Sequence, residues 1–482
     1  MKRIQIFFAI VLLITSCSAN YPGSMDTPKP VTEVIEVKDV NGSVSLSNGI
    51  YDLEVYVRGT EDALLIVEAG EKHSAGLLQP SVWKKLYIRG IEVTDGELSF
   101  RTRTQQSGDS YEVKAAYLTK TDKRRDLIRG GDFSMLSQVE KNEGMYYDED
   151  GRAGDCMELC ARHGMNLARL RLYNDPGNPA YYPSKQFFKG IQDEQNVLAL
   201  AKRAKAAGMQ IELTFHYSDS WTNGGDQYKP HAWQDYNQQQ LHEAVYTYTR
   251  DFLKKMVEQG TAPEYVSLGN EIQSGILFGN AEKPDSVGGF CNDMNNLASL
   301  LAEGSKAVRE VCPEAKIIIH LTTSADITVE TFKWFCSAMR NANLDYDIIG
   351  ASYYPFYGNK TNEQMIDAAE TLIRIYDKDF IFMEVGFAWN PTQPDGSIGQ
   401  IANNLPYEDM TPEAQRLFLL TLTEQIKACA SGRILGYIYW DPIYIDAPNC
   451  GWAVGEKNVT ANSALFDFTG NMLPAWDAIM YN

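Results

Sequence analysis

The amino-acid sequence predicts an α/β protein in which a (β/α)8 TIM barrel follows a small antiparallel β-sandwich. Residues 31–122 place apolar side chains at alternate positions, and no helical stretch interrupts them. From residue 123 onward, short apolar runs alternate with amphipathic helical stretches, and eight such runs can be counted. Alternating strands and helices favour a parallel sheet with crossovers, and eight units fit a closed barrel better than an open sheet.

The first 17 residues have the pattern of an export signal. Met1-Lys-Arg precedes an apolar run from Ile4 to Ile14, which is too short to span a bilayer. Ile14-Thr-Ser-Cys17 resembles a bacterial lipobox, in which the cysteine is lipidated and becomes the new N-terminus. The alternative is an ordinary signal peptide. We expect an exported bacterial lipoprotein, at the cell surface or in the periplasm, that meets the membrane only through a lipid on Cys17.

Residues 18–30 are rich in Ser, Asn, Pro and Gly, and they are predicted to form a tether. The sandwich is predicted over residues 31–122, with Asp95-Gly96 as one of its hairpin turns. Exposed rings such as Trp83 or Tyr87 would suit a carbohydrate-binding domain, and a spacer without ligand is the alternative.

The barrel is predicted over residues 123–482, with one apolar run for each strand. The predicted strands are 127–132, 166–173, 209–216, 265–270, 316–321, 346–352, 380–384 and 434–440. The predicted helices between them are 155–163, 195–207, 239–258, 293–311, 363–376 and 412–430. Gly164 and Gly208 follow two of these helices, at the position where a helix typically stops.

Composition narrows the class of ligand. A net charge of −19 repels phosphate backbones and anionic lipid, so nucleic-acid binding is not expected. The 11% aromatic content, including 27 Tyr and 8 Trp, suits the flat apolar faces of sugars. Without Cys17, seven cysteines remain, and their spacings do not form a metal site.

Polar and aromatic side chains follow the predicted strands at the point where each one ends, and such residues surround one pocket in a parallel barrel. The strand ends are Asp132, Arg171 with Asn174 and Asp175, His216 with Asp219, Asn270 with Glu271, His320, Tyr353 with Tyr354, Glu384, and Trp440 with Asp441. Two glutamates in one pocket suit glycoside hydrolysis. Nucleophile-elbow, zinc-protease and nucleotide-binding motifs are absent from the sequence.

Several of these segments resemble the signature segments of glycoside hydrolase family 53, in the same order. The segments are 171–176 (RLYNDP), 214–221 (TFHYSDSW), 268–271 (LGNE), 350–355 (GASYYP), 384–386 (EVG) and 439–442 (YWDP). The members of that family are secreted endo-β-1,4-galactanases that cut the galactan side chains of pectin. The resemblance covers roughly residues 127–482, and it implies a retaining mechanism on β-1,4-galactan.

The resemblance implies Glu271 as the general acid/base and Glu384 as the nucleophile. Glu271 should then have a raised pKa, and we expect Glu384 to be ionised with the help of nearby Arg171. The implied sugar contacts are Asn270 at the 2-hydroxyl, Trp440 as an apolar floor, His216, Asp132, Asp219 and one of Tyr353 and Tyr354, with Tyr354 as our candidate. The loop residues Trp233 and Trp389 are further candidates for stacking on sugars.

Two segments depart from the family pattern. Gly130-Gly-Asp132 stands where Gly-Ala-Asp is expected, and residues 390–399 lack the acid-rich run that binds calcium in some relatives. We therefore expect no metal or other cofactor, and a monomer that takes galactan or galacto-oligosaccharides. The alternatives are another retaining barrel endo-glycanase, such as a β-mannanase or β-glucanase, or a non-catalytic glycan-binding protein at the cell surface.

Overall fold

The computed structural model describes residues 34–106, 108, 110–122, 126–178, 186–279, 287–322 and 329–482. The export signal with Cys17 and the tether lie outside these residues. The chain forms two compact units. The first contains the residues up to Asp126 together with Thr423–Gly432 and Tyr481–Asn482, and the second contains Leu127–Leu422 and Arg433–Met480. Within the described residues, no helix is both long enough and apolar enough to cross a membrane.

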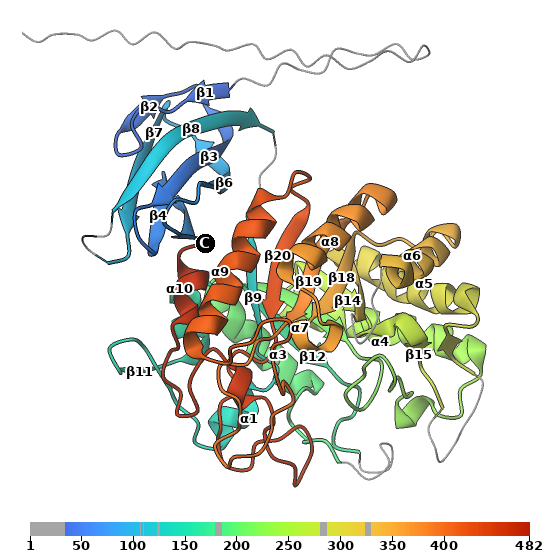
Figure 1. Ribbon diagram of the computed structural model, residues 1–482. Helices are drawn as coiled ribbons and strands as arrows, with labels where there is room; N and C mark the ends of the chain where they lie inside the picture. The colour runs from blue at the N-terminus through green and yellow to red at the C-terminus, as the bar shows by residue number, and fades with distance from the viewer. Residues whose placement is uncertain are drawn as a thin grey trace, which may run out of the picture. The chain divides into compact units, whose positions relative to one another are not determined.

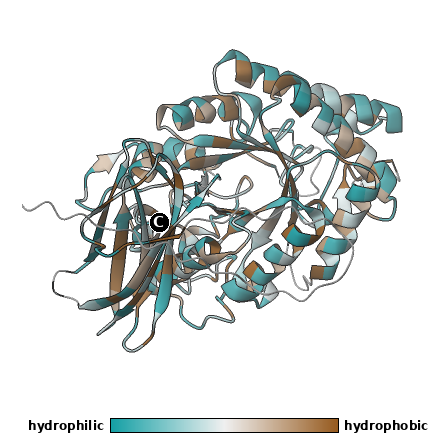
Figure 2. Ribbon diagram, turned by 90° about the horizontal axis from the view of Figure 1, so that it is seen from above, coloured by the Kyte–Doolittle hydropathy of each residue, from teal (hydrophilic) through white to brown (hydrophobic). Residues whose placement is uncertain are grey.

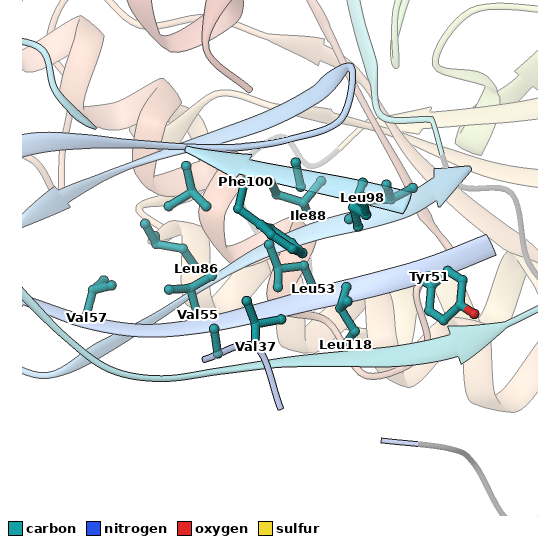
Figure 3. Close-up of a cluster of buried hydrophobic side chains, with 14 of the residues drawn as sticks. Val37, Tyr51, Leu53, Val55, Val57, Leu86, Ile88, Leu98, Phe100 and Leu118 are labelled. Carbon is teal, nitrogen blue, oxygen red and sulfur yellow. The ribbon is translucent and has the colours of Figure 1, made fainter. Parts of the chain in front are cut away.

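The first unit contains an antiparallel β-sandwich of two four-stranded sheets, with strand orders β1-β8-β3-β6 and β2-β7-β4-β5. The strands are β1 (Val34–Glu36), β2 (Ser43–Ser45), β3 (Gly49–Gly59), β4 (Ala63–Ala69), β5 (Lys72–Leu78), β6 (Lys84–Val93), β7 (Glu97–Thr104) and β8 (Tyr111–Thr121). Alternate residues of β3, namely Leu53, Val55 and Val57, point into the core with Leu118 of β8 (Figure 3). This period of two confirms the prediction of an antiparallel β domain.

The rings proposed as sugar platforms on the sandwich are partly covered. The indole of Trp83 stacks on Tyr56, with ring centroids 5.4 Å apart, and the guanidinium of Arg58 lies 4.8 Å from the indole centroid. The ring of Tyr87 lies 4.6 Å from the guanidinium of Arg89. Each ring therefore already has a partner on one face.

The second unit is a closed barrel of parallel strands, as predicted (Figure 1). In the order in which they close the barrel, the strands are β9 (Ile128–Asp132), β12 (Leu167–Leu172), β13 (Gln210–Phe215), β14 (Tyr265–Leu268), β17 (Lys316–Thr322), β18 (Ile348–Tyr353), β19 (Asp379–Val385) and β20 (Ile434–Tyr439). Every pairing in the barrel is parallel, and β20 pairs with β9 to close it. The observed strands match the predicted ones to within a few residues at each end.

A helix follows every barrel strand, and these helices carry both hydrophilic and hydrophobic residues (Figure 2). They are α2 (Cys156–Arg162), α3 (Glu194–Ala206), α4 (Gln238–Glu258), α5 (Met294–Val311), α6 (Val329–Asn341), α8 (Asn362–Tyr376), α9 (Pro412–Ala428) and α10 (Ala475–Met480). Asp155, Asp193 and Asn237 cap the first three, and each side chain accepts a backbone N–H of the first turn. Helices α6 and α10 were not predicted from the sequence.

Short helices, 3-10 turns and two-residue strands lie in the segments that follow the barrel strands. They are α1 (Leu136–Lys141), the 3-10 turns η1 (His231–Trp233), η2 (Ile272–Ser274) and η3 (Ala461–Ser463), α7 (Pro355–Gly358), and the strand pairs β10 (Tyr146–Tyr147) with β11 (Ala153–Gly154) and β15 (Gly275–Ile276) with β16 (Gly289–Phe290).

The register of the first barrel strands places three charged residues side by side. Arg169 of β12 pairs with Asp132 of β9 on one side and with Glu212 of β13 on the other. Arg171 lies one step further toward the carboxyl end and pairs with Thr214. Because side chains two residues apart on a strand share a face, Arg169 and Arg171 occupy successive levels of one face.

Candidate active site

Glu271 follows β14 in a backbone conformation that is uncommon for a residue with a side chain. Its φ of 52° and ψ of 52° lie in the left-handed region. The side-chain amide of Gln227 holds this turn, because its Nε2 donates to the carbonyl oxygens of Asn270 at 2.8 Å and of Glu271 at 3.3 Å. Such strain occurs often at functional sites, where the surrounding structure fixes it.

Glu271 and Glu384 lie close together, although they are far apart in the sequence. One carboxylate oxygen of each, with one ring nitrogen of His320, form a group whose atoms all lie within 4.8 Å of one another. Carboxyl groups in retaining glycosidases are about 5 to 5.5 Å apart, whereas inverting enzymes need about 6.5 to 9.5 Å to admit a water. The separation in this barrel therefore fits direct attack by one carboxylate.

The environment of Glu271 favours its protonated form. Burial, and next the charge of Glu384, raise the pKa of Glu271 to about 7. The Ser352 hydroxyl donates to Glu271 Oε1 at 2.6 Å, and Ser352 Oγ lies 2.9 Å from His320 Nε2. Burial and Arg169 hold the pKa of His320 well below its usual range, so its imidazole is neutral. Glu271 thus has the surroundings of a general acid.

Glu384 is held by a charged donor on one oxygen and a phenol on the other. Arg169 Nη1 donates to Oε1 at 2.8 Å, and the Tyr354 hydroxyl donates to Oε2 at 2.8 Å. The side chain of Glu384 is only 2% exposed, so these two contacts replace water. Tyr353 points elsewhere, because its hydroxyl donates to the Lys360 carbonyl and contacts Asn362. The structure thus favours Tyr354 of the two tyrosines.

The expectation that Arg171 supports Glu384 is wrong. Arg171 Nε lies 3.0 Å from Asp132 Oδ2, and its Nη2 donates to Asp441 at 3.0 Å. Its guanidinium also lies 4.5 Å from the Trp440 ring centroid. Arg169 lies inside β12 and was therefore not among the predicted strand-end residues. The Arg169-Leu-Arg171 spacing, which places both arginines on one strand face, was the available signal.

Asn270 is fixed at both ends of its amide. Its Oδ1 accepts from Arg169 Nη2 at 2.6 Å, and its Nδ2 donates to the Thr222 carbonyl at 2.8 Å. Arg169 therefore holds both Asn270 and Glu384, one through each terminal nitrogen.

His216 is oriented by Thr222, whose backbone N–H lies 3.1 Å from Nδ1. That contact makes Nδ1 an acceptor and leaves the proton of the neutral ring on Nε2. Burial, together with the two nearby arginines, holds the pKa of His216 well below its usual range. Among the described residues, Nε2 has no hydrogen-bond partner, so it is available as a donor to a ligand. Asp132 Oδ1 accepts from Arg171 Nε and from the Ser134 N–H, whereas Oδ2 lies near both arginines and has no hydrogen-bond partner among the described residues.

A group of tryptophans surrounds the carboxyl end of β20. Trp440 is buried, and its ring meets Trp221 edge to face with centroids 5.0 Å apart. Trp221 and Trp452 are parallel within 3°, with centroids 6.2 Å apart, and both are half-buried. Neither Trp221 nor Trp452 was among the candidate residues. Trp221 lies within one of the motif segments. Trp452 lies on a long loop, where the sequence has no period that would indicate which way a side chain points.

Three further residues that were predicted to contact sugars hold loops in place. Trp233 is 6% exposed, and its ring meets Tyr248 at a right angle. The Trp389 indole N–H donates to the Ala461 carbonyl at 3.2 Å. Asp219 accepts the backbone N–H groups of Asp175 at 2.9 Å and of His231 at 2.7 Å. The two rings are thus buried loop anchors rather than open platforms for sugars, and the two oxygens of Asp219 are taken by backbone.

The segment 390–399 offers little to a calcium ion. Its single acid is Asp395, and that carboxylate accepts from Lys457 Nζ at 2.5 Å and from the Ser397 hydroxyl at 2.6 Å. A hard cation needs several oxygen ligands, which this ion pair does not supply.

Comparison with known proteins gives matches that cover the barrel. A family model described as glycosyl hydrolase family 53 matches residues 128–479. An arabinogalactan endo-β-1,4-galactanase of Cellvibrio japonicus is 32% identical over 357 residues, which cover 72% of this chain and 89% of that protein. The GH53 catalytic domain of Ignisphaera aggregans aligns with a TM-score of 0.66 at 31% identity, covering 74% of this chain and 97% of that one. A fungal β-1,4-galactanase structure aligns with a TM-score of 0.60 at 26% identity, covering 73% and 99%.

Proposed function

The chain belongs to glycosyl hydrolase family 53, and we propose that it cleaves internal β-1,4-galactosidic bonds in the galactan side chains of pectin. The observation that supports the reaction most strongly is the Glu271 and Glu384 pair, with atoms within 4.8 Å of each other and unlike surroundings. One carboxyl has a raised pKa, and the other accepts from a guanidinium. Such a difference assigns an acid and a nucleophile.

In the proposed first step, protonated Glu271 gives its proton to the glycosidic oxygen while Glu384 attacks the anomeric carbon. The bond to the leaving sugar breaks, and a covalent glycosyl ester forms on Glu384. Glu271, now ionised, then takes a proton from a water that attacks the same carbon. The ester breaks, Glu384 is released as a carboxylate, and the product keeps the β configuration.

The remaining residues would position the sugar. The free Nε2–H of His216 offers a donor to a sugar hydroxyl. Asn270, fixed by Arg169, would contact the 2-hydroxyl, where hydrogen bonds strengthen in the transition state. The buried Trp440 would form the apolar floor, and half-buried Trp221 and Trp452 offer further apolar surface.

A substrate panel tests the proposal. Purified enzyme is given linear β-1,4-galactan, β-mannan and a β-glucan under the same conditions, and released oligosaccharides are separated by chain length. We expect short galacto-oligosaccharides from galactan, with the polymer shortened early, as endo action requires. Hydrolysis of mannan or glucan with galactan untouched would reject galactan in favour of another barrel endo-glycanase, and no hydrolysis at all would favour the glycan-binding alternative.

We also propose that the enzyme is an exported lipoprotein. The support is the charged start, the short apolar run and the lipobox-like segment ending at Cys17. A Cys17→Ala variant in a bacterial host should move from the membrane fraction to the soluble fraction. Retention of that variant in the membrane fraction would reject the lipid anchor.

A further inference from the structure

Arg169 is surrounded by more acidic groups than its contact with Glu384 requires. Its guanidinium is fully buried, and it lies 2.8 Å from Glu384, 3.6 Å from Asp132 and 3.5 Å from Glu212. Glu212 lies level with Arg169 on the neighbouring strand β13 and is itself 0% exposed. A carboxylate so deep in a barrel needs a partner, because desolvation of an unpaired charge is costly.

Glu212 faces Arg169 directly at 3.5 Å and also reaches it through the hydroxyl of Thr214. Thr214 Oγ1 donates to the Glu212 carboxylate, with oxygen distances of 2.8 and 3.0 Å. Arg169 Nε in turn donates to Thr214 Oγ1 at 3.2 Å. The single hydroxyl proton is directed at Glu212, and this leaves a lone pair facing the guanidinium. The hydrogen bonds therefore connect Glu212 to Thr214, and Thr214 to Arg169.

These hydrogen bonds fix the Nε edge of the Arg169 guanidinium, and the terminal nitrogens of the same guanidinium contact the residues that serve the reaction. Arg169 uses Nη1 to hold Glu384 and Nη2 to hold Asn270. A guanidinium is planar and rigid, so fixing the Nε edge sets the direction in which both terminal nitrogens point. Without that contact, the plane could rotate about the side-chain bonds and carry Glu384 with it.

We propose that Glu212 is a positioning residue of this hydrolase, which orients Thr214 and through it the Arg169 guanidinium that holds Glu384 and Asn270. The inference rests on the nucleophile role of Glu384 proposed above. A rival interpretation gives Glu212 only a structural role, as a buried acid that balances charge. Burial raises the pKa of Glu212 to about 7 although Arg169 lowers it, so charge alone does not separate the two interpretations.

The test measures the reactivity of Glu384 directly. A 2-deoxy-2-fluoro-β-galactobiosyl fluoride forms the ester with the nucleophile and needs no proton from Glu271, so its rate of inactivation reports how Glu384 is held. The rate is measured for the wild type, Glu212→Leu, Glu212→Gln and Thr214→Val. The labelled residue is identified by peptide mass, and kcat, KM and the midpoint of unfolding are measured in parallel.

We expect Glu212→Leu and Thr214→Val to lower kcat and the inactivation rate together by about 10- to 100-fold, since a displacement near 1 Å of a reacting group has about this effect. KM should stay within about 3-fold, because the His216 and Trp440 contacts remain and the Asn270 contact with the 2-hydroxyl strengthens only in the transition state. Glu212→Gln keeps an acceptor for the Thr214 hydroxyl and should recover most of the lost rate. Thr214→Val retains the volume of the side chain, so it keeps the test available if Glu212→Leu does not fold.

Glu264→Gln provides the matched control. Glu264 precedes β14 at the opposite end of the barrel, where its carboxylate accepts the Ile211 N–H at 2.8 Å and pairs with Lys205. This variant should lower the midpoint of unfolding and leave kcat and the inactivation rate unchanged.

Two failures can be told apart. If the wild type is labelled at a residue other than Glu384, the proposed nucleophile is wrong. If the wild type is labelled at Glu384 while folded Thr214→Val or Glu212→Leu reacts within 2-fold of its rate, the positioning role of Glu212 is overturned. Loss of activity only in proportion to the unfolded fraction would also overturn it.

Discussion

The sandwich and the barrel differ in how deeply they bury ion pairs. The sandwich core consists of hydrophobic side chains, and an ion pair such as Arg58 with Glu112 lies on its surface, with side chains 33% and 46% exposed. The barrel buries Arg169 and Arg171 together with several carboxylates, and the side chains that pair with them are at most 2% exposed. Ion pairs lie on the surface of both units, but among the described residues only the barrel interior pairs arginines and carboxylates whose side chains are almost completely buried.

The difference indicates where the chain does chemistry. An exposed ion pair contributes about 0 to 1 kcal/mol to the stability of the fold, because water solvates the two separate charges nearly as well. A buried pair has a large desolvation penalty, and well-packed hydrophobic residues often give equal or greater stability in its place. A buried network at the carboxyl ends of barrel strands therefore has a use other than stability, and the arrangement around Glu271 and Glu384 supplies one.

The largest expected effect comes from the nucleophile. Replacing Glu384 by Ala removes the group that forms the glycosyl ester, so turnover of galactan should fall by about 10⁴-fold or more. Binding of galacto-oligosaccharides, followed by calorimetry, should persist because the sugar contacts remain. Turnover within 10-fold of the wild type would remove Glu384 from that role.

Glu271→Ala should have the next largest effect, and the size should depend on the leaving group. On galactan, loss of the general acid should reduce the rate of cleavage by about 10² to 10⁴-fold. On a dinitrophenyl β-galactobioside, whose leaving group needs no proton, the bond-breaking step should be affected far less. Stopped-flow release of dinitrophenol measures that step. Equal losses on both substrates would contradict an acid role.

A matched pair of arginine variants tests the contrast between the two units directly. Arg169→Lys removes the planar fork that holds Glu384 and Asn270 together, and kcat should fall by about 100-fold. Arg58→Lys in the sandwich should change kcat by less than 2-fold and the free energy of unfolding by less than about 1 kcal/mol. Similar effects of the two substitutions on kcat would remove the distinction drawn between surface and interior charge.

The smallest effect is a shift in pH dependence. Glu271 must be protonated to act as an acid and its pKa is raised to about 7, so kcat/KM should fall as the pH rises above about 7. The hydrogen bond from Ser352 favours the ionised form and lowers this pKa. Ser352→Ala should therefore move the alkaline limb to higher pH, by about 0.5 to 1 unit. A shift to lower pH would contradict this assignment.

The sequence predicted the fold well because the barrel strands are short apolar runs that alternate with amphipathic helices. It also pointed to the two glutamates, since Glu271 follows β14 by three residues and Glu384 lies one residue before the end of β19. Arg169 was missed because it lies three residues before the end of β12, and only the register shows that it shares a level with Asp132 and Glu212. The direction of Tyr354 depends on the short helix α7, which begins at the next residue. Tertiary contacts set the direction of such a side chain. The alternation of side chains along a strand does not reveal it.

The stereochemistry of the first product tests the central claim most directly. Proton NMR spectra are recorded during the first minutes of cleavage of linear β-1,4-galactan, before the anomers equilibrate. Nucleophilic attack by Glu384, with Glu271 as acid and then base, predicts that the β anomer of the new reducing end appears first and converts slowly to the α anomer. First appearance of the α anomer would contradict the double displacement and the roles assigned to both glutamates.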